Sequence, residues 1–132
     1  MQITSELERL EEVSMAGFFV GWPNPPSEQT LRQLLINSPY RALAINDGQL
    51  IGFATGLSDG VLFSFLTCLE VLPDFQGNGL GKRLVEHLLE VMPRVYTVDL
   101  VCDPDVQGFY QKCGFIPYTS AVIRRHDLLA AR

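Results

Sequence analysis

The sequence predicts a single α/β domain of the α+β kind, spanning residues 1–132, in which helices flank a mixed sheet that contains an antiparallel meander. Three observations predict it. Strand-like segments joined by short Gly-containing turns follow one another in the middle of the chain. Apolar residues recur at helical spacing on both sides of them. The 132 residues are 47% hydrophobic and 19% charged, which suits one ordinary hydrophobic core and excludes a disordered chain.

The N-terminal part contains two predicted helical segments separated by a proline-rich linker. Leu7, Leu10 and Val13 recur at helical spacing among acidic residues. The linker, residues 22–27, contains three prolines, which remove the N–H donors that a helix needs. Ser27 at its end is placed to cap the second helix.

The predicted meander consists of three strands, at residues 40–46, 50–57 and 61–72. Asp47 and Gly48 form the first turn, and residues 58–60 form the second. Pro73 ends the third strand because proline cannot donate to a strand ladder.

A helix, a strand, a second helix and a last strand are predicted to follow, at residues 80–92, 95–101, 104–113 and 115–123. Pro93 ends the first of these helices. Asp103 and Pro104 provide the N-cap and first residue of the second, and Gly114 stands where a left-handed residue ends it.

Composition and charge exclude several classes of function. The net charge of −5 repels nucleic acids and anionic lipid surfaces, and the longest apolar stretch, residues 61–72, is too short to span a bilayer. The acidic N-terminus does not resemble a secretory signal, so we expect a cytoplasmic protein. The three cysteines are expected to be free buried thiols, and the two histidines, His87 and His126, lack metal-ligand spacing, so no metal is expected.

The most informative segment is VLPDFQGNGLGK, residues 71–82. It places a glycine-rich turn between a strand and a helix, where unpaired amides at the helix N-terminus can bind phosphate. Gln76 can add a side-chain donor. A tight turn that needs positive φ angles explains the same glycines, and the segment matches neither the Walker loop nor the dinucleotide fingerprint.

The stretch Q76-G77-N78-G79-L80-G81 resembles the Q/R-x-x-G-x-G/A signature of the GNAT superfamily of acyl-CoA-dependent N-acyltransferases. A second block, FYQKCGF at residues 109–115, resembles the "lYeklGF" segment of that superfamily. The resemblance covers about residues 40–118. Residues 1–39 are less typical, with Ile3 as the only remnant of a first strand.

The resemblance implies acetyl-CoA as co-substrate, bound where a splay between the two central strands exposes the edge of the first. The implied coenzyme-binding residues are Leu69, Val71, Gln76, Gly77, Asn78, Gly79, Leu80, Gly81, Lys82, Asp103 and Phe109. Two of them have a simpler explanation. Lys82 fits a solvated helix face, and helix capping accounts for Asp103, where the family frequently has asparagine.

Acetyl transfer from a thioester to an amine needs a neutral amine and an acid for the departing thiolate. Tyr110 is the candidate acid, since the family often places its proton donor at the matching tyrosine; alternatively it belongs to the apolar stripe of its helix. Glu70 is the candidate base, and it either lines a cleft that raises its pKa or pairs with a cation. Asp99 faces either the substrate cleft or another charged group.

The sequence therefore predicts an N-acetyltransferase that moves an acetyl group from acetyl-CoA to a primary amine of a small molecule or peptide by direct transfer. The acidic charge favours a cationic acceptor, and the protein is expected to be a monomer or a homodimer. A non-catalytic acyl-CoA-binding or regulatory module is the alternative. A third hypothesis is an assembly protein that uses its edge strand, with purely structural loop glycines.

Overall fold

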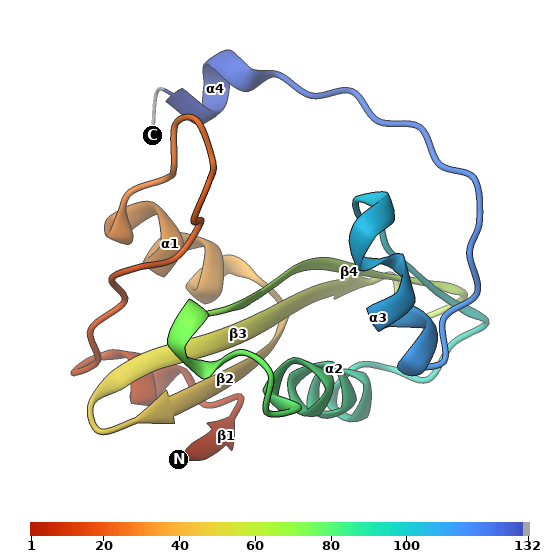
Figure 1. Ribbon diagram of the computed structural model, residues 1–132. Coiled ribbons are helices and arrows are strands. Elements are labelled where there is room, and N and C mark those ends of the chain that lie inside the picture. Colours follow the sequence, from red (N-terminus) through yellow and green to blue (C-terminus); the bar gives the residue numbers. More distant parts are fainter. Residues whose placement is uncertain (131–132) are drawn as a thin grey trace.

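The computed structural model describes residues 1–130 (Figure 1). In this part of the chain one five-stranded sheet holds the strands in sequence order. The strands are β1 (Gln2–Thr4), β2 (Tyr40–Asn46), β3 (Gln49–Ser58), β4 (Phe63–Val71) and β5 (Thr97–Asp99). The first four strands are antiparallel to their neighbours, and β5 runs parallel to β4, so the sheet is mixed as predicted.

The helices are α1 (Glu28–Asn37), α2 (Leu80–Val91), α3 (Gln107–Lys112) and α4 (His126–Ala130). Three single 3₁₀ turns accompany them: η1 (Leu7–Leu10), η2 (Pro73–Phe75) and η3 (Pro104–Val106). Ser27 caps α1 as predicted, because its hydroxyl accepts a hydrogen bond from the Thr30 amide at 3.1 Å. Among residues 1–130, every helix is too short or too polar to cross a bilayer.

Both predicted turns of the meander are present. Asp47 and Gly48 have φ angles of 49° and 73°, as a two-residue hairpin turn requires. In the second turn a carboxylate oxygen of Asp59 accepts hydrogen bonds from the amides of Val61, Leu62 and Phe63 at 2.8–3.0 Å. These bonds fix the start of β4.

Helices cover both faces of the sheet, so the domain has three layers (Figure 1). On one face, the buried side of α2, with Leu84 and Leu88, packs against β2 and β3. On the other face, Leu31 and Leu35 of α1 pack with the N-terminal segment over Phe53. A Cβ atom at Gly52 of β3 would lie 2.9 Å from the Leu84 side chain, so this glycine allows α2 to lie close to the sheet.

The strands β4 and β5 separate after a short pairing. Their ladder runs only from Phe63–Thr97 to Phe65–Asp99, and beyond it this edge of β4 has no strand beside it in the described chain. The register between β3 and β4 also shifts after Thr55, which leaves Thr67 as an extra residue in β4. The predicted splay is therefore present, with a bulge in β4 at its start.

The predictions for the two ends of the chain were partly wrong. The first predicted helix is only the single turn η1. The carbonyl oxygens of Leu10, at its end, and of Val13, beyond it, accept hydrogen bonds from the Arg32 side chain and not from the amides of a further helical turn. The remnant strand around Ile3 is a three-residue strand, β1, paired with β2.

The last predicted strand does not form. Residues 115–125 are irregular, and alternating apolar residues make a strand only where another strand lies beside them. For the same reason the strand predicted at residues 95–101 is reduced to the three residues of β5 that pair with β4.

Candidate active site

The glycine-rich loop is open where a ligand would approach. Gly77 and Gly79 have φ angles of 83° and 79°, and a Cβ atom built at either position would meet no other atom within 4 Å. Gly79 is the N-cap of α2, and no side chain caps this helix. The glycines therefore serve the turn geometry and leave open space at the N-terminus of the twelve-residue helix α2, whose first amides have no intrahelical partners.

Gln76 braces this loop. Its side-chain amide donates a hydrogen bond of 2.9 Å to the carbonyl oxygen of Val71, the last residue of β4. The predicted ligand donor is thus already engaged within the protein, and it ties the exposed loop to the end of the strand.

Other residues of the loop contribute in different ways. Asn78 is exposed, while Leu80 is buried in the core and offers the site only its backbone amide. A Cβ atom at Gly81 would lie 3.2 Å from the ring of Phe109, so the absence of a side chain lets α3 pack against the first turn of α2. Phe109 therefore packs against the first turn of α2, directly after the loop.

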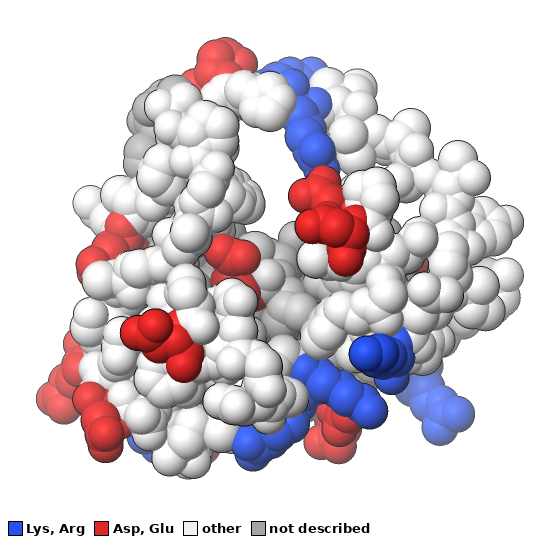
Figure 2. All heavy atoms as spheres, in the orientation of Figure 1, with Lys and Arg blue, Asp and Glu red and all other residues white. Residues whose placement is uncertain are grey.

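Basic side chains gather along the lower edge of the face in Figure 2, in the region where Figure 1 places α2. Lys82, in the first turn of α2, is exposed, and Arg83 follows it. In a chain with a net charge of −5, these basic side chains can attract phosphate groups.

The free edge of β4 lies between the loop and the bulge. Leu69 and Val71 turn their side chains into the α2 core and are half-buried. Since β5 pairs only as far as Phe65, the backbone at Leu69 is available on its outer side to an extended ligand.

Glu70, on the opposite face of β4, is held by the N-terminal segment. A carboxylate oxygen accepts a hydrogen bond of 2.9 Å from the amide of Phe19. The Phe19 ring is positioned by its edge contact with Phe53, which stands directly across from Glu70 in the β3–β4 register. Burial raises the pKa of Glu70, and the Phe19 amide lowers it in part. The cation pair considered for Glu70 is not what holds it.

Glu70 also lines a small cavity of about 100 Å³, together with residues 17–20, Pro73 and Gln76. The carboxylate thus lies in a cleft, as one of the two sequence hypotheses held. Trp22 packs against the Phe19 ring with centroids 4.8 Å apart and is 42% exposed.

Tyr110 lies on α3, packed against the α2 core and the rings of Phe109 and Phe115. Its hydroxyl makes no hydrogen bond to another residue of the described chain. Burial, with smaller contributions from neighbouring thiols and from Glu70, raises the pKa of Tyr110 to about 12. The hydroxyl therefore stays protonated at neutral pH.

Two of the three cysteines are poorly suited to carry an acyl group. Burial and the charge of Glu70 raise the pKa of Cys68 to about 12. Burial also raises the pKa of Cys113, although Lys82 lowers it in part. Because the thiolate is the nucleophile, neither residue is prepared for a covalent relay.

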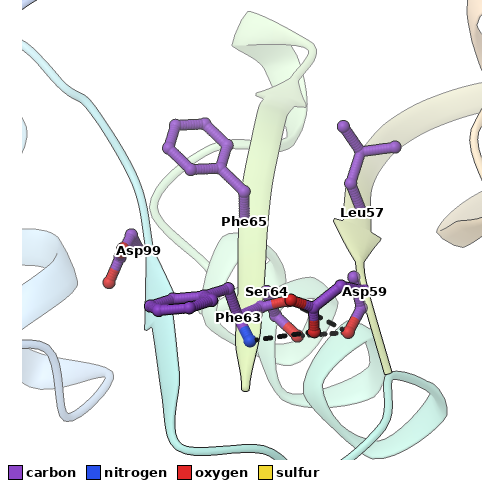
Figure 3. A pocket seen from close by; sticks show the side chains of 7 residues that line it. Leu57, Asp59, Phe63, Ser64, Phe65 and Asp99 are labelled. Carbon is purple, nitrogen blue, oxygen red and sulfur yellow. Dashed lines mark hydrogen bonds between the residues drawn. The ribbon is translucent and has the colours of Figure 1, made fainter. Parts of the chain in front are cut away.

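Asp103 and Asp99, the two aspartates considered for the site, lie in different surroundings. Asp103 is exposed at the N-cap of η3, as predicted, but its side chain makes no capping hydrogen bond; only its carbonyl accepts from the Val106 amide. Asp99 accepts a hydrogen bond of 2.7 Å from the Thr97 hydroxyl and faces a hollow of about 330 Å³ with Leu57, Phe63 and Phe65 (Figure 3). Asp99 therefore faces a hollow beside the splay.

The contact of Phe19 with Glu70 was not predicted from the sequence. The Phe19 φ angle of 61° is unusual for a residue with a side chain, and Phe19 lies between Gly17 and Gly21, whose φ angles are 96° and 83°. The G-x-x-x-G spacing in an otherwise apolar segment was the available signal of a tight loop.

Comparisons with known proteins agree with this geometry. A model of the Acetyltransferase (GNAT) family matches residues 7–115. An uncharacterized N-acetyltransferase, ycf52, of Pyropia yezoensis is 33% identical over 102 residues, which cover 74% of this chain and 59% of the relative. The ycf52 protein of Porphyra purpurea is 34% identical with the same coverage. The chain thus spans about three fifths of the length of these relatives.

The same fold recurs in solved structures. A putative acetyltransferase from Deinococcus radiodurans superposes with a TM-score of 0.92 at 38% identity, over 98% of this chain and 91% of that one. An aminoglycoside N-acetyltransferase crystallised with CoA superposes with a TM-score of 0.59 at 21% identity, over 79% of this chain and 80% of that one, a likeness of fold. Acetyl-CoA as co-substrate is consistent with these findings.

Proposed function

Because this chain belongs to the GNAT family of acetyltransferases, we propose that it transfers the acetyl group of acetyl-CoA directly to a primary amine of a small molecule or peptide. One observation carries the proposal. The splay of β4 from β5 leaves an edge of β4 free between Phe65 and the open glycine loop, on the strand that carries Glu70.

Binding of the donor uses backbone groups. The amides of residues 77–81 and the basic side chains of α2 suit the pyrophosphate, and the free edge at Leu69 suits the pantetheine arm. Gln76 keeps the loop in place through Val71.

The chemical step needs three proton transfers. Glu70, with its raised pKa, takes a proton from the acceptor ammonium, which leaves a neutral amine. The amine nitrogen then forms a bond to the thioester carbonyl carbon, and the carbon–sulfur bond breaks. Tyr110 gives its proton to the departing thiolate, so that CoA leaves as the thiol. The nitrogen, which still carries one proton more than an amide, gives that proton to the Tyr110 phenolate, and the acetyl group remains on the acceptor as an amide.

The acceptor we propose is cationic in solution. The chain has a net charge of −5, and the hollow beside the splay combines apolar side chains with the carboxylate of Asp99. Such a surface attracts an ammonium group that carries an apolar substituent.

The test pairs acetyl-CoA binding with CoA release. Thermal unfolding with and without acetyl-CoA measures binding, and a thiol-reactive dye measures CoA release with a panel of primary amines. We expect stabilisation of the fold by acetyl-CoA and amine-dependent release. Stabilisation without release by any amine would indicate a binding or regulatory module, and the absence of stabilisation would contradict the coenzyme site itself.

A further inference from the structure

The hollow of Figure 3 and the cleft of Glu70 lie on the same face of the sheet. Phe53, over which α1 packs, and Leu57 are four positions apart in β3, and the extra residue of the β3–β4 ladder lies in β4. Because side chains alternate along a strand, both face the α1 side. Their partners in β4 are Glu70 and Phe65, and partners directly opposite each other share a face.

This face is open between the hollow and the cleft. Leu57, Phe63 and Phe65 are 47%, 53% and 37% exposed. Thr67, the next residue of β4 toward the cleft on this face, is exposed as well, and its hydroxyl shares a hydrogen bond of 2.7 Å with that of Thr55 in β3. We use the term β4 strip for Phe63, Phe65 and Thr67. Exposed apolar side chains gathered in this way are typical of a binding surface.

Each end of the β4 strip carries a carboxylate without a cationic partner. At one end Asp99 accepts a hydrogen bond from the Thr97 hydroxyl, and it forms no ion pair with a residue of the described chain. At the other end one oxygen of Glu70 binds the Phe19 amide, and the second oxygen accepts no hydrogen bond from residues 1–130. The residues that line the hollow and the cleft include no Lys, Arg or His. Both ends therefore suit a positively charged group.

The spacing of the two carboxylates defines the length of a ligand. Asp99 pairs with Phe65, and Glu70 is five positions further along β4, so about 15 Å separate the two ends along the strand. A hydrogen bond from an ammonium group takes up about 2.8 Å at each carboxylate, which leaves roughly 10 Å between the two nitrogens. An extended alkyl chain rises about 1.25 Å per bond, so about six to eight methylene groups fill this gap.

We propose that the acceptor is a small diamine whose second ammonium group binds Asp99 while the first lies at Glu70. This inference rests on the proposed acetyl transfer and names its substrate class. The methylene chain lies on the rings of Phe63 and Phe65, which remove it from water. The hollow of about 330 Å³ has the size of a small-molecule pocket. Only the nitrogen at Glu70 loses a proton and takes the acetyl group, and the nitrogen at Asp99 stays an ammonium.

Matched amines test the second ammonium group. Diaminoheptane and octylamine have the same number of non-hydrogen atoms, but octylamine has a methyl group where the diamine has its second ammonium. CoA release with each amine gives kcat/KM. We expect diaminoheptane to be used at least about tenfold better than octylamine, because of the charged hydrogen bond to Asp99. Diaminobutane is too short to reach both carboxylates and should lose most of this advantage over pentylamine.

Asp99→Asn tests the residue that binds it. The substitution removes the charge and keeps an oxygen for the Thr97 hydroxyl. We expect the KM for diaminoheptane to rise to about that of octylamine, while kcat changes much less, since the lost interaction is made in the bound substrate as well as in the transition state. Asp127→Asn removes the same charge from an exposed position on α4, outside the hollow, and should keep the preference for the diamine.

The outcomes separate this inference from the proposed function. If no amine causes CoA release, acetyl transfer is contradicted and the diamine falls with it. If amines are acetylated but diaminoheptane and octylamine have similar kcat/KM, or if Asp99→Asn keeps the preference of the wild type, the diamine alone is overturned. A lysine-containing peptide that is used better than any of the diamines would also overturn it, in favour of a peptide acceptor.

The product provides a second readout. Once one nitrogen carries an acetyl group, the molecule has a single ammonium left and can no longer place charges at both carboxylates. We therefore expect mass spectrometry to show that the mono-acetylated diamine accumulates before any di-acetylated product forms. Di-acetylation at the rate of the first step would contradict recognition of the second ammonium group.

Discussion

The backbone amide of Phe19 donates a hydrogen bond of 2.9 Å to the carboxylate of Glu70, which joins the N-terminal segment to the fourth strand of the sheet. The contact depends on aromatic packing, since the Phe19 ring lies against Phe53, the cross-strand neighbour of Glu70. The carboxylate is thereby held in a cleft where burial raises its pKa. The consequences of this arrangement can be measured in stability and in activity.

The first prediction concerns stability and pH. Because the pKa of Glu70 is higher in the folded chain than its ordinary value, the folded state binds more protons in the range between the two values. The Glu70 contribution to the free energy of unfolding therefore decreases as pH rises from about 4 toward neutrality. Glu70→Gln keeps an oxygen for the Phe19 amide but does not titrate, so its unfolding free energy should decrease less over this range.

Denaturant unfolding at a series of pH values measures this difference. Glu86→Gln, at an exposed position on α2, is the control and should follow the wild type. Identical pH profiles for the wild type and Glu70→Gln would show that the pKa of Glu70 is not raised by the fold.

The second prediction concerns the base. If Glu70 takes a proton from the acceptor, Glu70→Gln should lower kcat/KM by about 10²- to 10⁴-fold, and the effect should not be rescued by higher acetyl-CoA concentration. Steady-state kinetics on the best amine of the panel measures it, with Glu86→Gln again as control. An unchanged kcat/KM would leave Glu70 as a structural partner of Phe19 alone.

The third prediction concerns the loop. Gly79→Ala introduces a Cβ atom that meets no protein atom within 4 Å but stands at a φ angle of 79°. We expect a loss of about 1 kcal/mol in stability from the backbone strain and a large reduction of the thermal shift caused by acetyl-CoA, because the new methyl group occupies the space beside the amides. Thermal unfolding with and without acetyl-CoA measures both effects.

Gly108→Ala is the matched control for this variant. The same change is made in α3 at a position where nothing lies within 4 Å and the φ angle is not positive, so the fold and the acetyl-CoA shift should both be preserved. If Gly79→Ala also keeps the full shift, the glycines of the loop serve only the turn.

The fourth prediction concerns the packing of α3 against α2. A methyl group at Gly81 would lie 3.2 Å from the Phe109 ring, which is closer than an ordinary contact. Gly81→Ala should therefore cost about 1–3 kcal/mol, and Phe109→Leu in the same chain should recover part of this loss. A double-mutant cycle in denaturant measures the coupling. Additive effects of the two changes would show that the residues do not constrain one another.

The central elements of the fold could be predicted from the sequence because local signals fix them. The Asp47-Gly48 turn, the Ser27 cap and the antiparallel pairing of the meander depend on residues near in sequence, and all three are present in the structure. The loop glycines were likewise marked by their spacing. Tyr110 was named because its segment resembles that of the GNAT superfamily, and its role and that of Glu70 stay predictions.

The remaining features depend on partners distant in the chain. Arg32 ends the first helical segment by binding the carbonyls of Leu10 and Val13, and Phe19 reaches Glu70 across 51 residues. The alternation of residues 115–123 gave no information on which strand, if any, lies beside them. Such long-range pairing leaves no periodicity in the sequence.

Tyr110→Phe tests the central claim most directly. The substitution keeps the ring that packs against Phe109 and removes a hydroxyl that makes no hydrogen bond within the described chain. We therefore expect acetyl-CoA affinity and the unfolding midpoint to stay close to the wild type, while kcat falls by about 10²- to 10⁴-fold. Tyr96→Phe, at an exposed ring, is the control and should keep full activity. A Tyr110→Phe variant with the kcat of the wild type would contradict proton donation by Tyr110 and the transfer mechanism proposed for this cleft.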